Sequence, residues 1–202
     1  MTTIGIDFSI NSTAVTINKD GELTIFSFVP NYRSELAGSK MHKALSDLIY
    51  VISYEKGGNT KDALADQRIK LLNADNLSDK ILEAIKPIIL EIPEIRIEGF
   101  SFGSKGNSFI DLVSFNTFLK VKLIQTYGHC IDVVPPKSLK KTYTGNGNAS
   151  KCDMLRKFLE VKDTPFKERL VELGLDRVEE FTLPKPIDDI VDSIALTCIE
   201  LT

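Results

Sequence analysis

The first 29 residues contain three short runs rich in isoleucine, valine, threonine and phenylalanine, and turn sequences separate them. The runs cover residues 2–9, 13–18 and 23–29, and their composition is typical of β-strands. The first link, 10–12, is short, and the second contains the Asp20-Gly21 pair that favours a tight turn. Consecutive strands with such short links pair in opposite directions, so the sequence predicts an antiparallel meander that Pro30 closes.

Helix and strand patterns alternate along the rest of the chain. The spacing of apolar residues predicts three helices, and a fourth segment has prolines at its start, as helices often do. Ser78 is the expected N-cap of the second helix, Pro87 disturbs its last turn, and Gly128 stops the third. The pattern predicts one α/β domain over residues 1–202, in which helices flank a mixed sheet. The expected helices are 39–54, 77–90, 110–127 and 184–196, the expected strands are 95–102 and 129–135, and the expected loops are 55–62 and 103–108.

Composition excludes several classes of protein. The chain is 43% hydrophobic and 26% charged, as is ordinary for a globular domain, and it contains no apolar run of the ~20 residues that a membrane helix needs. No secretory signal precedes the first strand, so we expect a cytoplasmic protein of a bacterium or of a phage-infected host. Cys130, Cys152 and Cys198 are odd in number and lack C-x-x-C spacing, which fits neither a disulfide framework nor a zinc site. His42 and His129 lie far apart in the sequence, which argues against a histidine-centred catalytic triad.

Four carboxylates stand where acids are uncommon or are spaced for joint action. Asp7 and Glu98 each lie inside an apolar strand sequence, where an acid must be paired, exposed or bound to a metal. Asp189 and Asp192 are three residues apart in a predicted helix and therefore share one face. Taken singly, the strand acids could be satisfied edge residues, and Asp188 or Asp189 could be a helix cap or a dipole partner. Together the four offer the hard oxygen ligands that Mg²⁺ or Mn²⁺ prefers, so the sequence predicts a divalent-metal site if they converge.

Four segments resemble the motif regions of RuvC-type Holliday junction resolvases, in the family's order and over nearly the whole chain. They are IGIDFSINSTAV at 4–15, IRIEGFSF at 95–102, TGNGNASK at 144–151 and DIVDSIA at 189–195. The resemblance implies the RNase H-like fold, with a five-stranded sheet flanked by helices. It also implies a homodimer that places two active sites on a four-way DNA junction.

The resemblance further assigns a reaction to the four acids. It implies that Asp7, Glu98, Asp189 and Asp192 together hold two Mg²⁺ ions, which Mn²⁺ can replace, with Asp7 as the bridging ligand. The implied reaction is the hydrolysis of a phosphodiester in branched DNA by metal-activated water, which leaves a 5′-phosphate and a 3′-hydroxyl.

Basic residues are the expected DNA contacts. The net charge is −3, but six basic residues against one acid between 137 and 157 give a local charge of +5. Lys140 and Lys151 match basic positions of the family, and the resemblance implies that they hold the phosphate backbone near the scissile bond. The alternative is that they are ordinary surface lysines. Lys141 and Lys105 are further expected contacts.

Three features depart from the family pattern or leave its reading open. Phe100 and Phe102 flank the family's usual aromatic offset; Phe102 is expected to stack on an unpaired base, although both could be core residues. Residues 30–80 look longer than the corresponding part of typical bacterial members, which predicts an insertion there. The helix over 110–127 carries more apolar surface than one face requires, so it either packs in the core alone or also contacts a dimer mate.

Other functions compete with a resolvase. The segment 4–7 and the turn after it also resemble the phosphate-binding hairpin of sugar kinases and actin-like ATPases, but that architecture needs two such domains, for which 202 residues are too few. A non-catalytic junction-binding protein of the same fold is a second possibility. An RNase H-type nuclease for RNA–DNA hybrids, or a nuclease for flaps and forks, is a third.

Overall fold

The computed structural model contains one mixed sheet of six strands, in the order β4-β3-β2-β1-β5-β6. It describes residues 1–31, 40–58, 60–100, 107–129, 131–161, 163–178 and 183–200. The predicted meander is confirmed, since β1, β2 and β3 pair in antiparallel fashion, while β5 pairs parallel to β1, β6 to β5 and β4 to β3. The strands are β1 Thr2–Asp7, β2 Thr13–Lys19, β3 Glu22–Pro30, β4 Tyr50–Tyr54, β5 Glu94–Glu98 and β6 Ile131–Val134.

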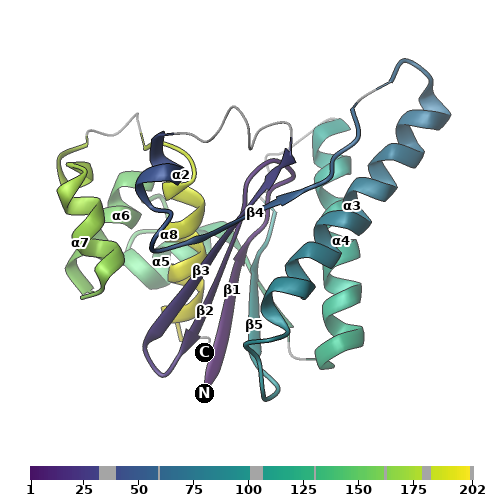
Figure 1. Cartoon of the computed structure of the whole chain (residues 1–202). Helices are drawn as coiled ribbons and strands as arrows, with labels where there is room; N and C mark the ends of the chain where they lie inside the picture. Colours follow the sequence, from purple (N-terminus) through teal and green to yellow (C-terminus); the bar gives the residue numbers. More distant parts are fainter. Residues whose placement is uncertain are drawn as a thin grey trace.

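Helices cover both faces of this sheet (Figure 1). Two long helices, α3 and α4, lie side by side on one face and run in the same direction, and α8 crosses the other face with the shorter helices outside it. The predicted α/β architecture of a mixed sheet flanked by helices is thereby confirmed. The helices are α2 Lys40–Ala44, α3 Ala63–Ile85, α4 Asn107–Tyr127, α5 Pro136–Thr144, α6 Lys151–Val161, α7 Pro165–Glu172, the 3₁₀ turn η1 Leu175–Arg177 and α8 Ile187–Cys198.

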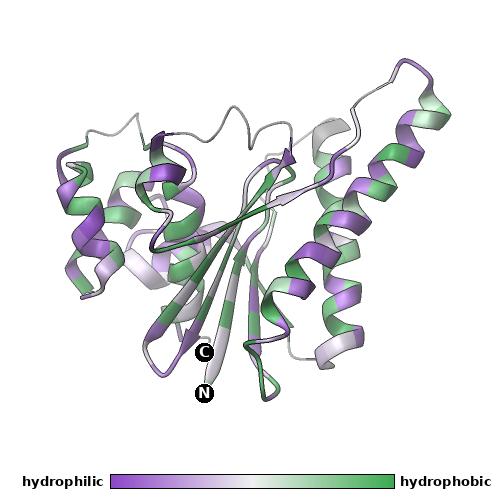
Figure 2. Cartoon of the chain, viewed as in Figure 1, coloured by the Kyte–Doolittle hydropathy of each residue, from purple (hydrophilic) through white to green (hydrophobic). Residues whose placement is uncertain are grey.

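The pleat of β1 divides its side chains between two hydrophobic cores. Because successive strand residues point to opposite faces, Ile4 and Ile6 pack into the core beneath α3 and α4. Gly5 and Asp7 therefore face α8. Figure 2 shows the resulting pattern, in which hydrophobic segments of the strands and of the inward helix faces meet at the sheet. The packing of helices on both faces therefore places Asp7 on the α8 side of the sheet.

Helix α8 lies unusually close to β1 because residue 5 is a glycine. A Cβ built on Gly5 would lie 2.0 Å from the backbone oxygen of Ser193 in α8, far inside van der Waals contact. The C-terminal end of α8 is fixed as well, since the buried guanidinium of Arg96 donates to the carbonyl oxygens of Leu196 and Ile199. Both contacts fix the position of α8 above the ends of β1 and β5.

The predicted helix over 39–54 is wrong in its second half. Helix α2 ends at Ala44, and residues 50–54 form β4, which runs parallel to β3 from Phe26 to Pro30. Tyrosine, valine and isoleucine in this segment favour a strand, and pairing with the free edge of β3 satisfies its backbone groups. The helical spacing of apolar residues did not reveal this pairing, and the sheet consequently has six strands instead of five.

Other predicted boundaries move. Helix α3 begins at Ala63, 14 residues before the predicted start, because Asp62 caps it by accepting hydrogen bonds from the backbone nitrogens of Leu64 and Ala65. Ser78 is not a cap; its hydroxyl donates to the carbonyl oxygen of Ala74 within the helix. Strand β5 ends at Glu98, before the predicted end at 102, and residues 103–106 of the predicted loop lie outside the described residues.

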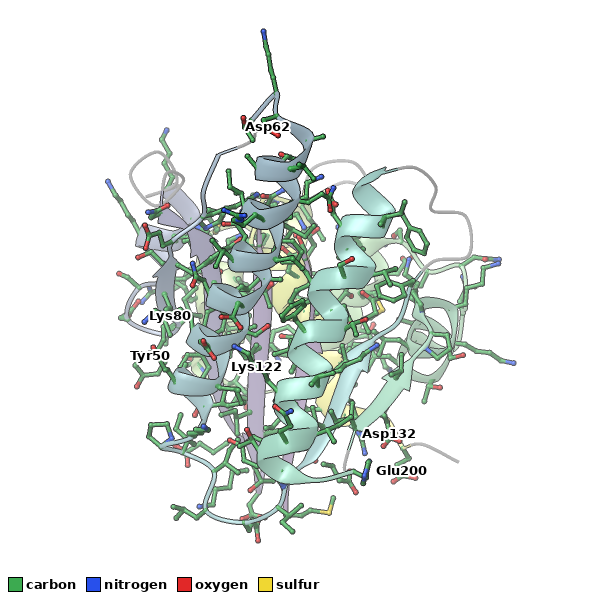
Figure 3. The ribbon with its side chains drawn as sticks, turned by 90° about the vertical axis from the view of Figure 1, so that its right-hand side faces the viewer. Tyr50, Asp62, Lys80, Lys122, Asp132 and Glu200 are labelled. Atoms are coloured by element: carbon green, nitrogen blue, oxygen red, sulfur yellow. The ribbon has the colours of Figure 1, made fainter. Side chains whose placement is uncertain are left out.

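An ion cluster joins α3 to α4 on the face shown in Figure 3. Lys122 of α4 lies between the two helices, and its Nζ is 2.6 Å from carboxylate oxygens of both Asp75 and Asp79 on α3. Among the described residues, no helix is long and apolar enough to cross a membrane.

Candidate metal centre

Asp7 and Glu98 lie side by side because their strands are parallel neighbours. The ladder between β1 and β5 runs in register up to Ile6 opposite Ile97. The next residue on each strand is the acid, so both carboxylates stand at the same end of the sheet and on the face toward α8. Asp7 is buried and Glu98 is half-buried.

Helix α8 adds the other two predicted acids from above. Oxygens of Asp7, Glu98 and Asp192 all lie within 4.8 Å of one another and could hold a metal ion. Asp189 lines the same cavity, one helical turn before Asp192. The structure thus brings together all four acids that the sequence singled out.

The acids line a cavity of about 340 Å³. Lys140 from α5 and Lys151 from the start of α6 stand on its wall, so it combines carboxylates with two ammonium groups. The remaining lining residues are Phe8, Gly99, Phe100, Leu112 and Pro136.

The clustered carboxylates raise one another's pKa values. Burial raises the pKa of Asp7 well above its usual value, and the charge of Glu98 raises it further. Burial and the charge of Glu98 raise the pKa of Asp192 to about 7, against the opposing effect of Lys151. Burial likewise raises the pKa of Glu98 and of Asp189. Without a cation the cluster therefore holds protons that isolated acids would release.

The donor set fits a hard divalent cation. Carboxylate oxygens are the ligands that Mg²⁺ and Mn²⁺ prefer, and three of them come from different elements of a rigid core. A bound cation would replace the protons and relieve the repulsion between Asp7 and its neighbours. Asp7, Glu98 and Asp192 would hold it.

The other residues predicted to contact DNA do not all lie at the cavity. Lys141 is exposed on α5 but does not line the cavity. Phe102 and Lys105 lie outside the described residues. Phe100 lines the cavity and packs edge-on against Phe109, with a centroid distance of 5.6 Å.

Sequence reasoning missed two side chains that hold the acids in place, Ser12 and Lys185. The hydroxyl of Ser12 donates to Oδ2 of Asp189 over 2.6 Å. Lys185 contacts both Asp188 and Asp189, and Lys151 contacts Asp188. The sequence interpretation of Asp188 as a cap or dipole partner did not foresee this burial. Ser12 lies inside the 4–15 motif segment, and Lys185 precedes Asp189 by four residues, but neither signal is specific without coordinates.

Comparisons of the sequence and of the fold with known proteins both find RuvC proteins. No model of a known protein family matches the sequence. The chain is 27% identical over 110 residues to crossover junction endodeoxyribonuclease RuvC of Sulfurovum sp. (strain NBC37-1), an alignment that covers 50% of this chain and 69% of that protein. It is 30% identical over 120 residues to the RuvC of Helicobacter hepaticus (strain ATCC 51449 / 3B1), covering 55% of this chain and 64% of that protein.

The fold comparison spans almost the whole chain. The structure of Thermus thermophilus RuvC superposes with a TM-score of 0.52 at 14% sequence identity, covering 98% of this chain and 91% of that one. A likeness at this identity establishes the RNase H-like fold, while the sequence alignments carry the relationship. The chain is therefore a distant homologue of the RuvC-type Holliday junction resolvases.

Proposed function

We propose that the protein is a divalent-metal-dependent endodeoxyribonuclease that cuts branched DNA, with the four-way junction as its preferred substrate. The convergence of Asp7, Glu98 and Asp192 from three separate elements carries the proposal. The names of the RuvC relatives support the substrate class. The alignments with the curated relatives cover about half of this chain, so activity and substrate are inferred from the site as much as from kinship.

The charged groups of the cavity each have a proposed role in phosphodiester hydrolysis. Bound Mg²⁺ would lower the pKa of a water and stabilise charge on the leaving oxygen. Asp7, Glu98 and Asp192 would hold the cation, and Asp189 is the fourth proposed ligand. The two ammonium groups on the cavity wall would draw a DNA phosphate toward the acids, because an anionic backbone would otherwise be repelled by them.

Several assignments extend this proposal beyond the cavity. Lys141, Lys105 and Phe102 are proposed DNA contacts outside the acid cluster. A homodimer would present two such cavities to the two strands of a junction that are cut. The single-domain organisation and the insertion within 30–80 remain predictions.

Asp7→Asn tests the proposal directly. The amide keeps the size of the side chain but removes the charge that binds a cation, so junction cleavage in Mg²⁺ should fall by about 10³-fold or more. Junction binding should persist, because Asp7 is buried and the proposed DNA contacts are the lysines of the cavity wall, which the substitution leaves in place. Cleavage and gel-shift assays on a synthetic four-way junction measure the two effects.

Matched controls show whether the effect is specific to Asp7 and which nucleic-acid structure is cut. Asp132→Asn removes an exposed acid of β6 and should leave cleavage unchanged. Linear duplex, flap and RNA–DNA hybrid competitors separate a resolvase from a flap nuclease or an RNase H-type enzyme. Full activity of Asp7→Asn in Mg²⁺ would contradict the assignment, and wild-type binding without cleavage would favour a non-catalytic junction-binding protein.

A further inference from the structure

Lys185 places an ammonium group directly on the carboxylates at the start of α8. Its Nζ lies 3.0 Å from Oδ2 of Asp188 and also contacts Oδ1 of Asp189. The lysine side chain is 55% exposed, whereas those of the two acids are 3% and 5% exposed. A half-exposed cation on a flexible side chain is therefore paired with buried anions.

This contact leaves Asp189 with both oxygens engaged. The hydroxyl of Ser12 donates to Oδ2 and Lys185 holds Oδ1. Among the described residues, the acids whose oxygens all lie within 4.8 Å of one another are Asp7, Glu98 and Asp192, a group that does not include Asp189. Coordination of a cation by Oδ1 of Asp189 would require the ammonium of Lys185 to leave.

Asp188 gives that ammonium another place to bind. Its Oδ2 already contacts both Lys185 and Lys151. Its Oδ1 is buried and has no hydrogen-bond partner in the described part of the chain. A buried acceptor without a donor is costly, so a shift of Lys185 from Asp189 toward Asp188 would satisfy one group as it releases another.

Whether Lys185 or a free divalent ion occupies Asp189 depends on the charge of each and on the covalent attachment that keeps the lysine nearby. An ammonium on a side chain is present at a fixed high local concentration and competes with a free cation for the same oxygen. A divalent ion carries twice the charge, so it can displace the lysine when its concentration is high enough. Lys185 would thus set the concentration at which Asp189 becomes available.

We propose that Lys185 is a tethered cation that occupies Asp189 in the free protein, so that one divalent ion binds tightly to Asp7, Glu98 and Asp192 and a second binds only after Lys185 moves to Asp188. The proposal rests on the proposed function, since it concerns the same metal centre. It makes Lys185 a positioning residue that controls how many ions the site holds.

Mn²⁺ binding to the full chain without DNA tests the idea, by isothermal titration calorimetry and by electron paramagnetic resonance of the free ion. For the wild type we expect one tight ion and a second that binds at least tenfold more weakly. Lys185→Met keeps the length of the side chain but not its charge, so it should tighten the second ion by about tenfold. Lys185→Arg should behave as the wild type does, because it keeps the charge.

Lys80→Met is the matched control, because it removes the same charge from a lysine that is 44% exposed and paired three residues away with Glu83. Lys80 lies on α3, on the opposite face of the sheet (Figures 1 and 3), and its substitution should change neither ion. Equal binding by wild type and Lys185→Met would overturn the proposal.

Asp192→Asn tells the two possible failures apart. If it removes the tight ion while Lys185→Met has no effect, the role of Lys185 fails and the metal centre stands. If the wild type binds no Mn²⁺ at all, the metal centre fails and the role of Lys185 fails with it. Melting curves of each variant establish that it is folded.

Discussion

Replacing Asp192 with asparagine should stabilise the metal-free protein at high pH while it removes a proposed metal ligand. Burial and the charge of Glu98 raise the pKa of Asp192 to about 7, so a protonated side chain is preferred in the folded state. In the unfolded chain the same carboxyl ionises near 4. The folded state therefore binds one more proton between these two values, and stability is lost as the pH rises from about 4 to about 7.

The size of this loss of stability follows from the difference between the folded and unfolded pKa values of Asp192. A change from 3.8 to about 7 is about 3 units, and at about 1.36 kcal/mol per unit it gives about 4 kcal/mol above pH 7. This value is an upper limit, because four acids share the repulsion and removing one charge also relieves the others. We expect Asp192→Asn to be about 2 kcal/mol more stable than the wild type at pH 8.5, a rise in Tm of about 4–8 °C.

Thermal and urea unfolding in the presence of EDTA, at pH 4.5 and pH 8.5, measures the effect. At pH 4.5 the folded wild type already carries a neutral carboxyl at position 192, so the variant should gain little there. Asp132→Asn, which removes an exposed acid, should show no comparable difference between the two pH values. An Asp192→Asn variant that loses stability equally at both pH values would refute the argument. It would show that burial and neighbouring charges do not destabilise the ionised carboxylate of Asp192.

Two further substitutions test the packing and the orientation of the site. Gly5→Ala would force a Cβ to within 2.0 Å of a backbone oxygen of α8, so the free energy of unfolding in urea should fall by about 3 kcal/mol or more. Gly58→Ala, where nothing lies within 4 Å, should be nearly neutral. Equal urea midpoints for the two variants would contradict the close approach of α8 to β1. Ser12→Ala removes the donor to Asp189, and hydrogen bonds to charged groups contribute about 1.5–3 kcal/mol, so both stability and cleavage rate should fall while junction binding persists. Ser46→Ala, at an exposed turn, is its control, and unchanged kinetics of Ser12→Ala would count against an orienting role.

The part of the fold that could be predicted is the part that local sequence determines. Alternating apolar residues and an Asp-Gly turn identified the meander, and Gly128, which has a φ of +83°, marked the end of α4. The spacing of three correctly put Asp189 and Asp192 on one side of a helix, whereas the shared face of Asp7 and Glu98 depends on the register of β1 against β5, which only the structure supplies.

The part that could not be predicted depends on tertiary contacts. Strand β4 forms because β3 offers a free edge to residues whose apolar spacing also suits a helix. The early start of α3 was hidden because its first turns carry a polar, exposed face, with Leu64 84% exposed, so no apolar stripe marks them. The pairing that forms β4 involves residues distant in the sequence, and the start of α3 leaves no mark in the hydrophobic pattern.

Asp188 shows why the position of a residue in a helix does not define its role. An acid in the first turn of α8 is favoured by the helix dipole. The dipole explains why residue 188 is negatively charged but not why it is buried. The structure adds two lysines, Lys151 from α6 and Lys185 from the segment before α8, whose ammonium groups meet at its Oδ2. Buried anions require compensation, and because Lys185 also contacts Asp189, the two lysines together offset the charges of two buried acids. This arrangement depends on how α6 and the segment before α8 fold against the start of α8, so the position of Asp188 in the first helical turn could not reveal it.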